Sequence, residues 1–442
     1  MVARLSRRPS RHLARQMADS EHVARSAHGI GTRHDLPVSP FYAFAGAFAA
    51  LLVSFLGLGL LWSRSCLTGE AAGRPLPAAV QRCADARATT LALRALGLAA
   101  YLTLLAHLLL GPDDPARNPA PAAVYALFWA GLVPLSLLCG PLWRRLNPLR
   151  TLHLLGRALL RRPEPDRAPP APLGLWPAAL GLAAFTWLEL ASPAPASRAA
   201  LLTFLGAYTV LQLAAAARWG EAWFARGDAF EAYAGLLARL SPFGRRADGR
   251  LVVRNPLDGL DATERVPGLA VTLCVLLGST AYDGLSGTAG WTGTLQTSPL
   301  GRTPTATLGL LAVIGVTGAV YALCTAATRV RGAGAAFAHS LVPVALGYLV
   351  AHYFTLFTTE APHAVALPVG AGPGPVPEPP LEPGALAALQ VCAVVTGHVL
   401  GVVAAHDRAV RLQPPERAVS GQIPLLVLMI TYTLGGLGLL VA

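Results

Sequence analysis

The stretch FYAFAGAFAALLVSFLGLGLLW at residues 41–62 is the first of ten apolar segments that decide the fold of this chain. It carries no charged side chain. A helix rises about 1.5 Å per residue, so a segment of this length crosses the roughly 30 Å hydrocarbon core of a bilayer. Because a segment surrounded by lipid must satisfy its own backbone hydrogen bonds, we expect it to be a membrane-spanning helix.

Nine further segments of similar length and polarity follow. They predict an all-α fold, a polytopic integral membrane helical bundle of about ten transmembrane helices within residues 41–442. The composition agrees, because 54% hydrophobic residues, 13% charged residues and a mean hydropathy of +0.50 are too apolar for a soluble protein of 442 residues. The later predicted spans are residues 89–110, 122–143, 173–191, 198–217, 267–283, 305–327, 336–358, 385–406 and 421–441.

The net charge of +12 comes from 35 basic residues, all of them arginine, a usage that suggests a GC-rich bacterial genome. We therefore expect a multi-pass protein of the bacterial cytoplasmic (plasma) membrane. The arginines lie in short connections beside apolar spans, where they meet anionic headgroups, so the lipid bilayer is the expected partner and nucleic acid is not. The sequence indicates no particular protein partner.

The distribution of arginine predicts the orientation. Connections after the first, third, fifth, seventh and ninth predicted spans carry 24 arginines. The connections after the other spans carry three, when the first residue of the following span is counted with each connection. By the positive-inside rule, the arginine-rich connections are cytoplasmic and both termini are external.

The tail at residues 1–40, which we expect to be disordered, opposes this prediction because it carries seven arginines. Three explanations are open: the tail resists translocation, the number of spans is odd, or these residues are absent from the mature protein. The stretch ARSA at residues 24–27, just before His28, loosely resembles a cleavage site.

Two extramembrane segments stand out. Residues 218–266 form the largest cytoplasmic segment, in which Asp228 and Glu231 have the spacing of a capping box and apolar residues follow at helical intervals. We expect an amphipathic helix lying on the inner interface there, and a hairpin turn at residues 248–249. Residues 368–384 are rich in proline and glycine and predict a disordered external linker.

Several ionisable residues fall in the outer part of the membrane in this orientation. Imidazole and carboxylate groups together suit a divalent transition metal such as zinc, copper or iron, and three protein ligands with one open position can activate water for hydrolysis. No HExxH or CxxC motif is present, so the convergence is inferred from depth alone. The candidate metal ligands are His107, Glu189, Asp283 and His352, with His28 and His34 of the tail.

Interfacial placement is the alternative for three of these residues. His107, Glu189 and Asp283 lie near span ends, where a polar side chain reaches the headgroup region at modest cost. His352 lies deeper, and Asp283 ends an unusually short predicted span before a Gly/Ser/Thr-rich loop that could fold back toward the bundle.

His398 falls near the middle of the ninth predicted span, so its imidazole should face the bundle interior. Thr396 and Tyr432 are the expected hydrogen-bond partners. A structural hydrogen bond and a proton-relay role both remain open for this residue, and haem is not expected.

Several stretches of the chain resemble a bacterial multi-pass membrane family whose members are often labelled fenitrothion hydrolase, a membrane enzyme that degrades organophosphates. The resemblance covers nearly the whole chain from His28 onward. It is carried by HGIGTRHDLP (28–37), NPLRTLH (147–153), WFARGDAFEAYAGLLARLSPFGRRADGRLVVRNPLDGL (223–260), LLGSTAYDGLS (276–286), AHSLVPVALGYLVAHYF (338–354) and TGHVLGVVAAHDRAV (396–410).

The resemblance implies hydrolysis of a phosphotriester or phosphorothioate, with a metal-bound hydroxide attacking phosphorus and an aryloxide leaving. The positions that it suggests as ligands or acid–base groups are His28, His34, Asp283, His352 and His398, the last three as catalytic residues. The basic stretch before His28 departs from the cleavable apolar leader expected in such a family.

We therefore expect a metal-dependent hydrolase of a hydrophobic small molecule. The alternatives are a transporter or metal-handling permease that uses the buried histidines and carboxylates as a pathway, and a non-catalytic membrane assembly factor.

Overall fold

A computed structural model of the chain describes residues 40–114, 117–165, 167–366, 378–414, 417 and 420–441. Within these residues, ten helical segments are long and apolar enough to cross a membrane, which confirms the predicted all-α polytopic bundle. The tail with His28 and His34, and most of the predicted linker, lie outside the described residues. The spans are α2 (Pro40–Leu61), α4 (Arg87–Leu110), the composite α5–η2–α6 (Ala120–Ala122, Ala123–Ala130, Leu132–Cys139), α9 (Trp176–Leu190, preceded by η3, Ala171–Leu173), α10 (Arg198–Trp219), α14 (Leu269–Ser286), α16 (Arg302–Ala327), α18 (Leu341–Ala366), α19 (Pro383–Leu412) and α20 (Ile423–Val441).

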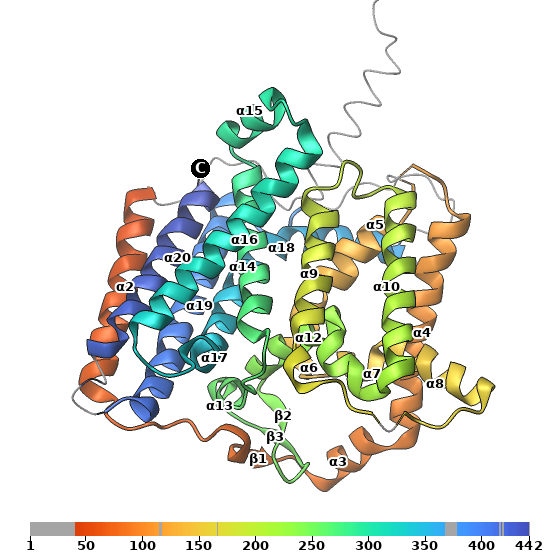
Figure 1. Cartoon of the computed structure of the whole chain (residues 1–442), viewed down its shortest axis with the longest axis horizontal. Helices are drawn as coiled ribbons and strands as arrows, with labels where there is room; N and C mark the ends of the chain where they lie inside the picture. The colour runs from red at the N-terminus through yellow and green to blue at the C-terminus, as the bar shows by residue number, and fades with distance from the viewer. Residues whose placement is uncertain are drawn as a thin grey trace, which may run out of the picture.

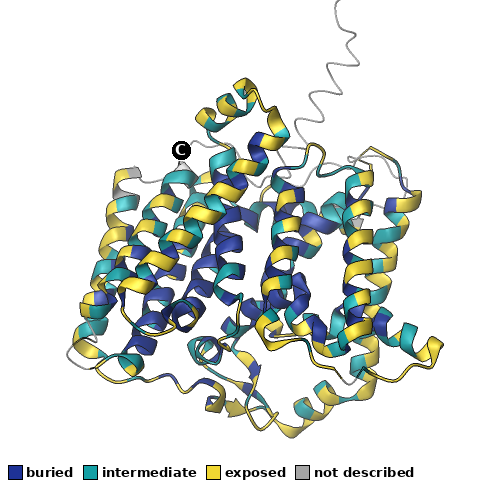
Figure 2. Ribbon diagram, viewed as in Figure 1, coloured by how far each residue is buried: buried dark blue, intermediate teal, exposed yellow. Residues whose placement is uncertain are grey.

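The helices α14 and α18 form the centre of the bundle (Figure 1). In their spanning windows 72% and 78% of residues are buried, against 11% for α4, which therefore lies at the periphery and presents leucines outward. Figure 2 shows this gradient, with buried ribbon in the middle and exposed faces on the outer helices. α18 packs against α19, η2 and α14, and α14 also packs against α16 and α9.

Glycines allow α18 and α19 to pack at close range. An added Cβ would lie 2.4 Å from the Pro343 carbonyl oxygen at Gly397, and 2.8 Å from the Ser340 carbonyl oxygen at Gly401. At Gly347 it would lie 2.5 Å from a carbonyl oxygen of α19. Small residues four apart share one helix face and let backbones approach, so these glycines set the distance between the two helices.

The arginine-rich connections gather at one end of the bundle, which we call the arginine-rich end, and α15 (Ala289–Thr297) stands at the opposite end near the C-terminus (Figure 1). This segregation is what the predicted orientation requires, and the orientation itself stays a prediction. The elements at the arginine-rich end are η1 (Gly69–Ala71), β1 (Arg74–Pro75), α3 (Ala78–Asp85), α7 (Trp143–Leu146), α8 (Pro148–Leu160), η4 (Glu221–Trp223), α11 (Phe224–Gly227), α12 (Ala229–Leu237), η5 (Ala238–Leu240), β2 (Phe243–Arg245), β3 (Leu251–Val253), α13 (Pro256–Asp261), α17 (Ala333–Phe337), η6 (Ala338–Ser340) and η8 (Ser420–Gln422).

A small antiparallel sheet with strand order β1-β3-β2 covers this end. Arg245 pairs with Leu251 across the β2–β3 hairpin, and the turn between them contains Gly249 at a φ of 80°. A left-handed residue in a short loop is typical of hairpins closed by glycine, so the predicted hairpin turn is confirmed.

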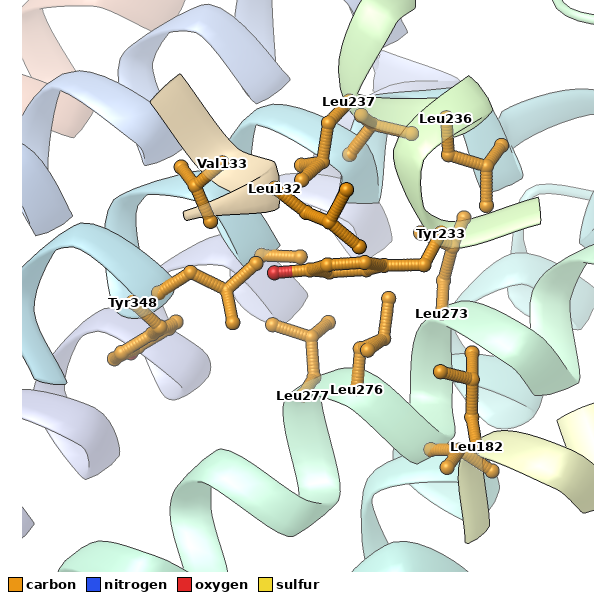
Figure 3. Close-up of a cluster of buried hydrophobic side chains, with 14 of the residues drawn as sticks. Leu132, Val133, Leu182, Tyr233, Leu236, Leu237, Leu273, Leu276, Leu277 and Tyr348 are labelled. Carbon is orange, nitrogen blue, oxygen red and sulfur yellow. The ribbon is translucent and has the colours of Figure 1, made fainter. Parts of the chain in front are cut away.

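The predicted helix after Asp228 exists, but its expected position on the inner interface is wrong. Asp228 caps α12 by accepting bonds from the Phe230 and Glu231 amides at 2.9 and 3.2 Å. However, α12 is buried on nearly every side and packs against α9, α6, α7 and α18. Tyr233 on this helix lies among leucines of α6 and α14 (Figure 3). The segment therefore enters the bundle.

A buried polar network holds α12 in this position. The Arg150 guanidinium donates two bonds of 2.7 Å to the Glu231 carboxylate, in a bidentate pair. The Asn147 amide donates to both Asp228 and Glu231, and the Tyr208 hydroxyl donates to Asp228 at 2.8 Å. Burial and the neighbouring Glu231 charge raise the pKa of Asp228. Neutralisation of Glu231 by Arg150 explains why this helix need not lie at the surface.

The amphipathic surface helix is α8 instead. It projects from the side of the bundle at the arginine-rich end (Figure 1). One face buries Arg150 and His153, whereas Leu155 and Leu159 are 53% and 84% exposed. An exposed leucine face beside arginines suits the membrane interface.

Candidate functional site

Three helices bring ionisable side chains together inside the bundle: Glu189 from α9, Asp283 from α14, and His352 from α18. At about 1.5 Å per residue, the three residues lie roughly 17 to 21 Å from the helix ends nearest the arginine-rich connections, so they share one depth. All three are buried, and Tyr353 follows His352 on the same helix.

Asp283 and His352 form an acid–imidazole pair. The His352 Nδ1 atom lies 3.4 Å from Asp283 Oδ2, and both side chains are less than 8% exposed. A carboxylate beside a histidine orients the imidazole ring. Beside this pair, an added Cβ at Gly284 would lie 3.0 Å from Leu439 Cβ, so the glycine lets α14 and α20 approach closely.

Glu189 and Tyr353 form a second pair beside the first. The Tyr353 hydroxyl lies 3.1 Å from each oxygen of the Glu189 carboxylate and donates its proton to it. Trp129 stands perpendicular to Tyr353, with ring centroids 6.1 Å apart, and stacks on Tyr233 at 4.4 Å. Glu189 and Asp283 also interact electrostatically. The two pairs therefore form one cluster. The rings of Trp129 and Tyr233 lie beside it, and we call them the aromatic wall.

Trp129 of the aromatic wall lies in an irregular helix. Tyr125 and Trp129 lie in η2, a π-helix of eight residues that packs on α18. Such helices are rare and occur often at functional sites. The Tyr125 hydroxyl donates to the Pro195 carbonyl at 2.9 Å. These aromatic residues were not among the predicted site residues, and their signal in the sequence is the aromatic-rich stretch YALFW at residues 125–129.

His107 takes no part in this cluster. Its Nδ1 atom lies 2.7 Å from the Thr103 carbonyl oxygen of its own helix, and its carbonyl accepts bonds from Gly111 and Asn118. Its helix α4 lies at the edge of the bundle (Figure 1). This position matches the interfacial alternative, so the prediction that His107 joins the other ligands is not supported by the structure.

His398 faces the bundle interior, as predicted, and is fully buried. Its Nδ1 atom lies 2.8 Å from the Val394 carbonyl oxygen, and Tyr348 meets the ring edge-on at 5.5 Å. The expected partner Tyr432 is wrong, because its hydroxyl donates to the Thr317 carbonyl at 2.5 Å. Thr396 makes no hydrogen bond to His398 in the described part of the chain. Tyr348 lies one helical turn from His352, so His398 adjoins the cluster without joining it.

The loop after the short sixth span folds back onto the bundle, as the sequence suggested. α14 continues to Ser286, and the chain then forms α15, whose Trp291 returns to contact Tyr282 with ring centroids 5.8 Å apart. The loop therefore packs on the end of α14 through Trp291, which joins an apolar cluster with Tyr282 and Ala191.

The described residues do not form a complete metal site. Among them, no group of three or more His, Cys, Asp and Glu side chains lies close enough to hold a metal ion. Asp283 and His352 offer two ligands, and His28 and His34 lie outside the described residues. The predicted zinc, copper or iron therefore stays a prediction, and we derive no chemical step through it.

No protein-family model, curated protein or solved structure matches this chain. The resemblance to fenitrothion hydrolases thus stays a prediction. The geometry of the cluster carries the functional argument.

Proposed function

We propose that this multi-pass membrane protein hydrolyses a hydrophobic ester, with the Asp283–His352 pair as general base. The observation that carries the proposal is the pairing of a buried carboxylate and a buried imidazole inside a membrane bundle. Ionisable groups within membrane spans are costly and usually functional. The resemblance supplies the substrate class, an organophosphate or phosphorothioate triester.

The chemistry follows from the orientation of the ring. His352 Nδ1 faces Asp283 Oδ2 at 3.4 Å, so a proton held on Nδ1 beside the carboxylate leaves the lone pair of the neutral imidazole on Nε2. That atom takes a proton from water as the water oxygen bonds to phosphorus, and the bond from phosphorus to the aryloxide breaks. The Asp283 carboxylate stabilises the imidazolium that forms, and His352 then returns the proton to the aryloxide.

The Glu189–Tyr353 pair would hold an aromatic ring in a fixed position beside the Asp283–His352 pair. Tyr353 is fixed by its bond to Glu189, and its ring packs against Trp129. Aromatic surface beside a few fixed polar groups is typical of sites for apolar ligands. These features support a hydrophobic small molecule as the substrate.

The test measures nitrophenol release from fenitrothion by membranes that contain equal amounts of inserted protein. We expect His352→Gln to lower turnover by about 100-fold or more, because a general base contributes about 10²- to 10⁴-fold. His107→Gln is the matched control and should retain turnover, since His107 lies outside the cluster. Unchanged turnover in His352→Gln would remove this residue from the mechanism.

A permease is the second candidate. The observation that favours it is the position of Glu189, Asp283 and His352 at one depth on three spanning helices, since such groups mark ion and proton pathways. Sealed vesicles distinguish the two functions. Transport predicts that fenitrothion or a metal ion enters without chemical change, whereas hydrolysis predicts nitrophenol.

A further inference from the structure

A cavity of about 390 Å³ opens at the arginine-rich end, far along the bundle from the acid–imidazole cluster. It lies between η1, the end of α13 with the connection that follows, and the last turns of α19. Its volume falls in the range of sites for small ligands. Its lining residues are Gly69, Glu70, Asp261, Ala262, Thr263, Arg265, Arg408 and Arg411.

Three guanidinium groups face two carboxylates in this lining. Arg408 donates to Asp261 Oδ1 at 2.7 Å and to the Asp261 carbonyl at 2.8 Å, and Arg411 also pairs with Asp261. Arg411 has a second partner, Asp407, at 3.2 Å. Burial alone would raise the pKa of Asp261, but the two arginines hold this pKa below its usual value. The Asp261 charge is therefore shared by two arginines.

Of the three guanidinium groups in the lining, Arg408 and Arg411 have carboxylate partners and Arg265 has none among the described residues. Arg265 has no ion pair or hydrogen bond within the part of the chain that the structure describes, and it lies close enough to Arg408 for the two guanidinium groups to repel each other. The negative charge of Glu70 acts on Arg239 and Arg254, which lie beyond the lining. An anion beside Arg265 would relieve the repulsion between the arginines.

We propose that this cavity binds a phosphate group. Tetrahedral phosphate oxygens accept bonds from several guanidinium groups at once, and the planar fork of arginine suits them. Arg265 supplies donors that no described residue engages. Arg408, fixed by Asp261 and by the Ala336 carbonyl, and Arg411, which pairs with Asp261 and Asp407, supply positive charge at the cavity wall. The phosphate belongs either to a phospholipid headgroup or to a small soluble ester.

The experiment compares the wild type with Arg265→Gln and Arg411→Gln. Arg331→Gln is the control, because this exposed arginine lies at the same end outside the lining. Purified protein in detergent is titrated with inorganic phosphate while its thermal unfolding is followed. Native mass spectrometry then measures phosphatidylglycerol retained after transfer from nanodiscs of phosphatidylglycerol and phosphatidylcholine.

Removal of one guanidinium contact should weaken binding about tenfold. Stabilisation by inorganic phosphate that Arg265→Gln weakens and Arg331→Gln preserves would support a soluble ester. Retention of phosphatidylglycerol with the same dependence on Arg265 and Arg411 would support a headgroup. If neither probe binds, or if all three variants match the wild type, the proposal is wrong. Arg265→Gln removes no ion pair or hydrogen bond among the described residues. A loss of binding in this variant therefore reports on the cavity and not on a failure to fold.

Discussion

At the scale of single residues, two pairs of buried side chains in this protein bring an acidic and a basic group together. Arg150 and Glu231 are 4% and 7% exposed and share two hydrogen bonds. Asp283 and His352 are similarly buried. A buried charge that loses its partner is strongly destabilising, whereas an exposed pair contributes little.

The Arg150–Glu231 pair gives a direct test of this dependence. Glu231→Gln should lower the free energy of unfolding by about 3 to 5 kcal/mol, because Arg150 stays buried and keeps only the more exposed Glu221 carboxylate, 3.7 Å away, as counter-charge. Urea unfolding in detergent measures the change. The matched control is Glu264→Gln, which breaks the exposed pair with Arg226 and should cost less than about 1 kcal/mol. Equal losses in both variants would contradict the role given to the buried pair.

Asp261 should make stability depend on pH. Its pKa in the folded protein lies below the usual value, so its contribution is complete above the unfolded pKa of about 4 and is lost as the pH falls through the folded value. The wild type should therefore lose stability between pH 5 and pH 2 more steeply than Asp261→Asn. Thermal unfolding across this pH range measures the slopes, and parallel slopes would show that Asp261 has no shifted pKa.

At the scale of elements, the ten spans could be predicted because length and apolarity alone decide them. The burial of α12 could not be predicted, because a helix of nine mostly apolar residues has the same sequence pattern at a surface and in the interior. What decides is the contact of Glu231 with Arg150 of α8, which the sequence does not show. The π-helix η2 has no periodicity that distinguishes it from an α-helix in sequence.

The α18–α19 contact gives a prediction at this scale. Gly397→Ala places a Cβ 2.4 Å from the Pro343 carbonyl oxygen, so the two backbones must separate. Overpacking of this kind should lower stability by about 1 to 3 kcal/mol. Gly435→Ala on α20 is the control, because its Cβ meets nothing within 4 Å and alanine favours a helix. A neutral Gly397→Ala variant would contradict the tight packing.

At the scale of the whole molecule, depth in the membrane groups Glu189, Asp283 and His352, and the structure places Asp283 beside His352 and Tyr353 beside Glu189. The same reasoning failed for His107, because depth says nothing about position around the bundle, and α4 lies at the edge. The aromatic wall and the pairing of Tyr353 with Glu189 depend on which helices are neighbours, which one sequence does not reveal.

The orientation also belongs to this scale. A reporter active only outside the cytoplasm should be active when fused after Val441 and inactive when inserted at Gly249, in the hairpin at the arginine-rich end. The reverse pattern would place the acid–imidazole cluster on the cytoplasmic side.

The proposed hydrolysis depends on Asp283 and His352 inside the bundle. Its most direct test follows fenitrothion and nitrophenol together in sealed vesicles that contain equal amounts of wild-type or Asp283→Asn protein. We predict that the wild type releases nitrophenol and that Asp283→Asn, which keeps the size of the side chain but removes its charge, releases it about 100-fold more slowly. Equal release by both proteins, or uptake of intact fenitrothion without any nitrophenol, would contradict the account.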